Sequence, residues 1–229
     1  MNNNFVVRPL EKAYGMKAKE RLDSLIKPEG SLGILEQTVI RYAEIKGTAK
    51  PEDLACKKRA LMVFGTPTVM NRVERFMRED APLFQVAKKL GVQVYANVLL
   101  ADTAEEALIE GSLLTQEYLN EGKFDAIGFG ILDRDNFTLH GVAGAMLQAA
   151  SQRVAFVPDC CETNAALAIA KEYEPSVTDY CLPLQDVLQL NLSNETGIIA
   201  VLNLNLLVAG LRCYNEMLTF EEAGVNRPV

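Results

Sequence analysis

Short apolar runs alternate with amphipathic stretches through the middle of this 229-residue chain. The apolar runs predict buried strands at residues 60–64, 92–99, 125–129 and 153–157. Helical periodicity predicts helices at residues 69–90 (interrupted near Pro82), 103–120, 139–151 and 163–173. Strands separated by helices require crossover connections, and such connections produce parallel sheets. The pattern therefore predicts an α/β fold, with a parallel sheet that carries helices on both faces.

The two ends of the chain depart from this alternation. Amphipathic helices are predicted at residues 10–25 and 32–46, before the first strand, and at 196–218, after the last one. We expect these three helices to pack together as a small helical layer. The predicted organisation is thus residues 1–50 and 190–229 in the helical layer, and residues 51–189 in an α/β Rossmann-like core.

Composition narrows the class of protein. The formal net charge of −7 argues against a nucleic-acid or anionic-membrane surface, because both reward lysine and arginine. The first residues lack a basic-then-apolar signal pattern, and no uninterrupted apolar run reaches the ~20 residues of a membrane span. The five cysteines match no zinc or disulfide spacing, which favours reduced thiols and a cytoplasmic protein. We expect no metal and no redox cofactor.

One corner between the first two predicted helices has an unusual sequence. The segment Arg21-Leu-Asp-Ser-Leu-Ile-Lys27 runs into Pro28-Glu29-Gly30-Ser31-Leu32-Gly33. Pro28 disfavours the helical conformation of Lys27, Gly30 gives the corner its freedom, and Ser31 can cap the next helix. A purely structural corner would use the same residues.

The corner resembles the N-terminal signature of the nicotinate-nucleotide–dimethylbenzimidazole phosphoribosyltransferase family, which activates the lower-ligand base of cobamides. Two further segments resemble the same family in the same order: residues 142–159, which include Ala143-Gly144-Ala145 and Asp159, and the C-terminal residues 190–197 and 215–225. The resemblance covers most of the chain, which is identified as a shortened and divergent member. It implies symmetric dimers and a small-molecule nucleotide or aromatic base as ligand, while the charge and hydropathy predict no nucleic-acid or membrane partner.

The family's general base is the glutamate of Leu-Gly-Glu-Gly-Thr-Gly. Aligned without a gap, that position falls on Asn194, and Glu195 stands one residue later. The resemblance therefore implies Glu195 as the catalytic base, although Glu195 could also simply favour the positive end of the following helix. The substrate-binding residues that it implies are Lys27, Glu29, Gly30, Ser31, Leu32, Asn136, Thr138, Asp159, Asn194, Thr196 and Gly197.

Three departures from the family pattern affect the expected chemistry. The glutamate that would act as general base stands one residue later than in the family. Gly65-Thr66-Pro67-Thr68 replaces the family's Ala-Asp-His-Gly, and no counterpart of the family's glycine-rich phosphate segment follows Gly130. Asn136 and Thr138 are the nearest equivalents of that segment, and Arg134 is the best-placed cation for a phosphate. We expect His140 to be an ordinary, partly exposed histidine rather than a proton shuttle, and Cys160 and Cys161 to line the core rather than to supply a reactive thiol.

Three functions remain open. The chain is a transferase of phosphoribose from nicotinate mononucleotide, or a catalytically degenerate homologue that acts as a ligand-binding protein or as partner subunit to a full-length enzyme, or it has a different activity on the same scaffold.

Overall fold

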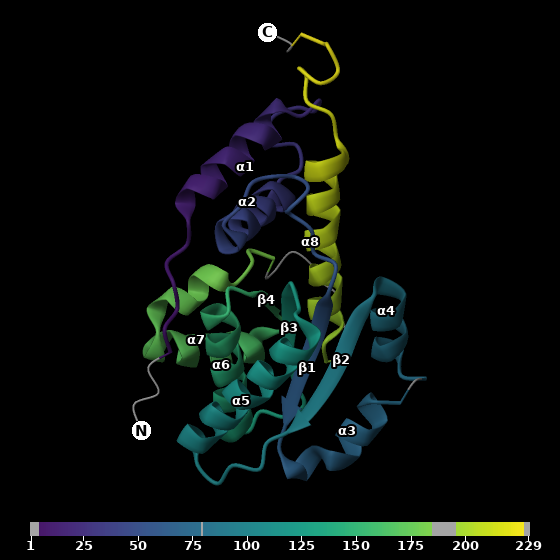
Figure 1. Ribbon diagram of the computed structural model, residues 1–229. Coiled ribbons are helices and arrows are strands. Elements are labelled where there is room, and N and C mark those ends of the chain that lie inside the picture. Colours follow the sequence, from purple (N-terminus) through teal and green to yellow (C-terminus); the bar gives the residue numbers. More distant parts are fainter. Residues whose placement is uncertain (1–4, 79, 185–195, 227–229) are drawn as a thin grey trace.

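The computed structural model describes residues 5–78, 80–184 and 196–226 (Figure 1). Within them one parallel sheet has the strand order β2-β1-β3-β4. The strands are β1 (Arg59–Gly65), β2 (Val92–Val98), β3 (Ala126–Ile131) and β4 (Ala155–Pro158). β3 and β4 are buried along their whole length, and β1 is buried after Arg59. Such continuous burial explains the uninterrupted apolar runs, because a parallel sheet is covered on both faces.

Helices cover both faces of this sheet, as predicted (Figure 1). One face packs against α5 (Ala104–Gly122), α6 (Asn136–Ser151) and α7 (Cys161–Tyr173), and the other against α4 (Pro82–Leu90) and α8 (Ile198–Glu216). Two short 3₁₀ turns (Pro67–Val69 and Pro175–Tyr180) and α3 (Met70–Phe76) complete the core elements. The prediction of an α/β fold is therefore confirmed.

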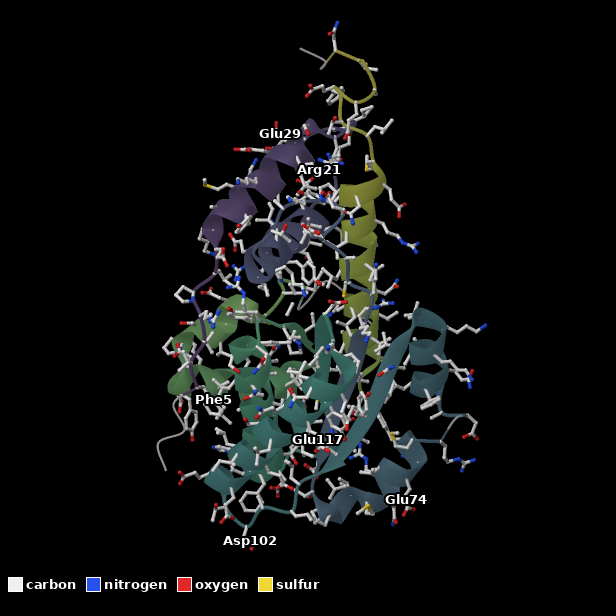
Figure 2. The ribbon with its side chains drawn as sticks, in the orientation of Figure 1. Phe5, Arg21, Glu29, Glu74, Asp102 and Glu117 are labelled. Carbon is white, nitrogen blue, oxygen red and sulfur yellow. The ribbon has the colours of Figure 1, made fainter. Side chains whose placement is uncertain are left out.

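The remaining helices, α1 (Lys12–Ser24) and α2 (Ile34–Lys46), pack on each other, and α2 also packs on α8. The chain returns to this region after α8, where Leu25 bridges Thr219 and the N–H of Ile26 donates to the carbonyl of Leu218 at 3.0 Å. The segment after α8 thus meets the corner between α1 and α2, whereas the first described residues run from α1 towards α7, where Phe5 lies (Figures 1 and 2). The division at residues 50 and 190 stays a prediction.

Helix α8 is long and apolar enough, by length and composition, to cross a membrane. Half of its most apolar window is buried in the fold, however, where it contacts α2, α4 and three of the strands. The helix is apolar on most sides because it serves as a core helix between the sheet and α2.

Local sequence signals explain most of the element ends. Pro82 occupies the first turn of α4, Gly91 ends α4 with a positive φ of 66°, and the Thr103 hydroxyl accepts from the N–H of Glu106 at the start of α5. α6 begins at Asn136, three residues before the predicted start, because Asp135 caps it by accepting from the N–H of Phe137 at 2.8 Å.

The expected cap at Ser31 is wrong. The residue at the N-cap of α2 is Gly33, whose φ of 55° is unfavourable for other residues. The Glu36 side chain instead reaches back to accept from the N–H of Leu32 at 3.2 Å. A carboxylate in the first helical turn therefore provides the acceptor that the sequence suggested for a serine.

Candidate functional site

The carboxyl ends of the parallel strands lie at one edge of the sheet. From β1 the chain proceeds to β2 on one side, and it then crosses over to β3 on the other side. The ends of β1 and β3 therefore flank the point where the chain order reverses, which is where open α/β sheets bind ligands. The candidate site consists of the segments that leave this edge, together with the start of α8.

Asp133 ties the ends of β1 and β3 together. One of its oxygens accepts from the backbone N–H and the hydroxyl of Thr66, both at 2.9 Å, and the other accepts from the buried Thr138 hydroxyl. The segment that replaces the family's Asp-His pair is thus held by hydrogen bonds to a carboxylate from the neighbouring strand. Thr138, a predicted substrate-binding residue, has its hydroxyl engaged inside the protein.

Asp159, at the end of β4, holds the start of α8. One carboxylate oxygen accepts from the N–H of Gly197 at 2.7 Å and the other from that of Ala200 at 3.0 Å. Burial raises the pKa of Asp159 above its ordinary value, and the hydrogen bonds from the helix oppose that rise. Asp159 therefore occupies the positive end of α8, a position that an anionic ligand would otherwise favour.

Thr196 and Gly197 lie at this same edge. The Thr196 hydroxyl donates to the carbonyl of Ile131, the last residue of β3, at 3.0 Å. Gly197 has a φ of 91°, and a Cβ there would meet a Leu61 methyl group at 2.6 Å, so only glycine fits. The structure thus brings Asp159, Thr196 and Gly197 together. The predictions for Asn194 and Glu195 lie outside the described residues.

The corner between α1 and α2 lies elsewhere. It adjoins the end of α8, whereas Thr196 and Gly197 precede its start, and a 19-residue helix is about 28 Å long. Figure 2 shows this separation, with Glu29 of the corner at the top of the molecule and Glu74 of α3 at the bottom. Within one chain, the structure does not bring Lys27, Glu29, Gly30, Ser31 and Leu32 together with the sheet edge.

Lys27 forms a buried ion pair with Glu36. Its ammonium lies 2.7 Å from a Glu36 carboxylate oxygen, and the two side chains are only 5% and 12% exposed. Glu29, Gly30 and Ser31 are exposed, while Leu32 is half-buried. The lysine of the corner thus has a structural partner of its own.

Replacing Lys27 with alanine is expected to lower the free energy of unfolding by about 3 kcal/mol, because Glu36 would remain buried without its counterion. Urea denaturation measures this change. The control is Lys19→Ala, which removes an exposed lysine paired with Asp23 on α1 and should have a much smaller effect. Equal stability of Lys27→Ala and the parent would show that the ion pair is not structural.

The two adjacent cysteines have high thiol pKa values. Burial raises the pKa of Cys160 to about 11, and hydrogen bonds from the thiols of Cys161 and Cys160 lower the pKa of Glu162 to about 2. Both facts favour a protonated thiol beside an ionised carboxylate at neutral pH, so a thiolate nucleophile is disfavoured. Cys161 is exposed at the start of α7 and does not line the core, which corrects that expectation.

The other predicted groups also have partners within the fold. Arg134 pairs with Glu162, and its side chain is otherwise 81% exposed. His140 is half-buried in the second turn of α6, with its Nδ1 atom 2.8 Å from the carbonyl of Asn136. Asn136 itself is exposed at the first position of α6.

A cavity of about 480 Å³ opens at the sheet edge, and of the predicted site residues that the structure describes only Thr196 lines it. Three arginines of the segment after β1 line it, together with Leu132 and Thr196 and the first residues of α4. The sequence does contain one signal for this cluster, the spacing of Arg72, Arg75 and Arg78. Residues three positions apart lie on neighbouring parts of a helical surface.

Comparison with known proteins shows what the chain resembles. The family model described as "Phosphoribosyltransferase" matches residues 7–106 and 135–186. The unmatched interval between these ranges contains most of α5 and all of β3, including Gly128 and Gly130.

Curated relatives carry the name nicotinate-nucleotide–dimethylbenzimidazole phosphoribosyltransferase. The protein of Citrifermentans bemidjiense is 24% identical over 341 aligned positions, covering 96% of each chain. That of Chloroflexus aurantiacus is 22% identical over 342 positions, covering 97% of each. Both alignments are longer than this 229-residue chain, so the relatives contain segments that it lacks.

Two solved structures share the fold. They are the crystal structures of CobT and of nicotinate-nucleotide–dimethylbenzimidazole phosphoribosyltransferase from Thermus thermophilus, with TM-scores of 0.76 and 0.78. Their identities to this chain are 18% and 19%, and each comparison covers 94% of this chain and at least 99% of the other.

Proposed function

This chain belongs to the nicotinate-nucleotide–dimethylbenzimidazole phosphoribosyltransferase family, and we propose that it transfers phosphoribose from nicotinate mononucleotide to an aromatic base. The observation that supports this most directly is the anchoring of Thr196 and Gly197 to the ends of β3 and β4. Glu195, the candidate base, immediately precedes these two anchored residues in the sequence.

The proposed reaction is a displacement at the ribose carbon that carries nicotinate. A ring nitrogen of a heterocyclic acceptor, or the hydroxyl oxygen of a phenol, attacks this carbon and loses its proton, and the bond to the nicotinate nitrogen breaks. Nicotinate leaves with the electron pair of that bond, and Glu195 accepts the proton of the attacking N–H or O–H. A carboxylate within hydrogen-bond reach of that group suffices for this step.

The site differs from the family pattern around the acceptor. Thr66 and Pro67 stand where the family has an acid and an imidazole, and the hydroxyls of Thr66 and Thr68 lie 2.6 Å apart in a hydrogen bond. Hydroxyl groups can donate to or accept from an acceptor base, but they do not carry charge at neutral pH. We therefore propose an altered acceptor preference, for an uncharged heterocycle or phenol, because the family's acid and imidazole are replaced here.

The test incubates the purified protein with nicotinate mononucleotide and a panel of acceptors: dimethylbenzimidazole, adenine and simple phenols. Chromatography follows free nicotinate and the ribosylated product. We expect nicotinate release that depends on the acceptor. Absence of release with every acceptor, from protein shown to be folded by circular dichroism, would overturn the proposal in favour of a ligand-binding protein or a partner subunit.

We also propose that the chain acts as a cytoplasmic homodimer. All five cysteines are free thiols, which fits a reducing compartment. The exposed corner at Glu29–Ser31 lies about one α8 length from the sheet edge of its own chain, so only a second copy could bring a corner to that edge. A dimer with two-fold symmetry would then place one corner at the sheet edge of each copy.

Light scattering is expected to give about twice the chain mass of 25.2 kDa. The measurement is made at several protein concentrations, with and without nicotinate mononucleotide. A mass near that of one chain under all these conditions would contradict the homodimer, and the corner residues would then have no route to the sheet edge.

A further inference from the structure

The cavity at the sheet edge has an unusual concentration of guanidinium groups. Arg72, Arg75 and Arg78 follow β1 at a spacing of three residues, and all three line the cavity of about 480 Å³. They come from α3 and the residues directly after it, which lie at the bottom of the molecule in Figure 1. Thr196 lines the same cavity, so the arginines share a space with the segment that follows the candidate base.

The charges of these arginines are only partly compensated. Arg78 pairs with Asp80 at 2.8 Å, and Asp80 also lines the cavity, while Arg72 donates a hydrogen bond to the uncharged carbonyl of Leu132. The Arg75 side chain forms no ion pair or hydrogen bond with any residue that the structure describes. Such a cluster favours a ligand that carries several acceptor oxygens and at least one negative charge, and a phosphate group has both.

The start of α4 adds to this preference. Ala81, at its N-cap, offers no side-chain acceptor, and Leu83 of the first turn lines the cavity beside Pro82, which has no N–H of its own. The first N–H groups of a helix attract anions, because they lack partners within the helix and carry its positive dipole end. The arginines and the start of α4 therefore both favour an anion in the same cavity.

Other cationic positions at this edge are already neutralised by carboxylates of the chain. Asp159 accepts from the first N–H groups of α8, and Glu162 pairs with Arg134. An incoming phosphate at either position would meet an existing negative charge. Arg134, the cation that the sequence favoured, is thus less suited to this role than Arg75.

We propose that Arg72 and Arg75, beside the Arg78–Asp80 ion pair, bind the phosphate of the nucleotide substrate, in place of the glycine-rich segment that the family uses. This proposal rests on the proposed function for the identity of the nucleotide. The anion site itself is independent of turnover, because its chemistry requires only a phosphate monoester.

Calorimetric titration with ribose 5-phosphate, ribose and nicotinate tests the site without any turnover. We expect ribose 5-phosphate to bind and ribose not to bind, and Arg75→Gln to weaken the binding of ribose 5-phosphate about tenfold or more. Arg75→Lys retains the charge and should recover part of the affinity. The control is Lys89→Gln, which removes an exposed positive charge from the other end of α4 and should leave the affinity unchanged.

Arg75 is the preferred position because it has no partner to lose among the described residues. The site would be overturned by folded wild-type protein that fails to bind ribose 5-phosphate, by an unchanged affinity in Arg75→Gln, or by arginine-dependent binding of nicotinate alone. Turnover separates the two proposals. Binding of ribose 5-phosphate without nicotinate release would support the anion site and contradict the transferase activity. Turnover with an unchanged KM for nicotinate mononucleotide in Arg75→Gln would support the transferase activity and contradict the anion site.

Discussion

Replacing Gly144 with alanine is expected to lower the free energy of unfolding by about 4 kcal/mol or more. Gly144 lies in α6, and a Cβ at this position would be 1.8 Å from the carbonyl oxygen of Leu108 in α5. The obstacle is backbone, so no side-chain rotation can relieve it. Gly111 makes the reciprocal approach, since its Cβ would be 1.9 Å from the carbonyl oxygen of Gly141.

The consequence reaches beyond these two helices. α6 is buried along most of its length between α5, α7 and the sheet, and its first turn carries Thr138 to Asp133. Pushing α6 away from α5 would therefore disturb the link between the ends of β1 and β3. We expect Gly144→Ala to impair any ligand binding at the sheet edge as well as stability.

Urea unfolding at a fixed protein concentration measures the stability change, and a fixed concentration is needed because dimerisation would shift the transition. The matched control is Gly141→Ala in the same helix, where the Cβ would meet a Leu99 methyl group at 2.3 Å. A side chain can move, so this loss should be about 1–2 kcal/mol. A loss below about 1 kcal/mol in Gly144→Ala would show that the helices separate freely.

The sheet and its helices could be predicted because their signals are local. The buried strands are continuous apolar runs, and Pro82 and Gly91 mark the two ends of α4, since proline fits a first helical turn and glycine a left-handed C-cap. The start of α6 was placed too late because the apolar pattern begins at Leu139, while the capping aspartate stands at position 135. Apolar periodicity finds the body of a helix better than its first turn.

The arrangement of the candidate site depends on contacts that no local pattern reveals. Asp159 meets Gly197 across 38 residues of sequence, and Thr66 meets Asp133 across 67. Resemblance to the family identified Lys27 and Gly197 as belonging to its motifs, but it did not show that α8 separates them. The ion pair of Lys27 with Glu36 could not be predicted either, because a lysine in a family motif suggests a ligand-binding role rather than an ion pair with a nearby glutamate.

The arginines after β1 were missed for a different reason. They match no family motif, and the negative net charge of the chain draws attention away from cationic sites. Only the fold shows that Arg72 reaches the carbonyl of Leu132 and that the cavity also reaches Thr196. A local cluster can therefore favour an anionic ligand even though the protein as a whole is acidic.

Replacing Glu195 with glutamine is expected to reduce the turnover number for nicotinate release by about 10²–10⁴-fold. Glutamine is close to glutamate in size but cannot accept the proton of the attacking base. Binding of ribose 5-phosphate should remain unchanged, because the proposed anion site uses arginines after β1. Loss of turnover with retained binding would therefore identify a role in proton transfer.

The shift of the glutamate permits a sharper version of this test. The double variant Asn194→Glu, Glu195→Gly restores the family's order of glutamate followed by glycine, and we expect it to regain activity relative to Glu195→Gln. Glu172→Gln, at an exposed position of α7, is the control for a general loss of negative charge. Wild-type turnover in Glu195→Gln would exclude Glu195 as the base. If both Glu195→Gln and the double variant were inactive, the base would be specific to position 195, and the one-residue shift would be a functional feature of this chain.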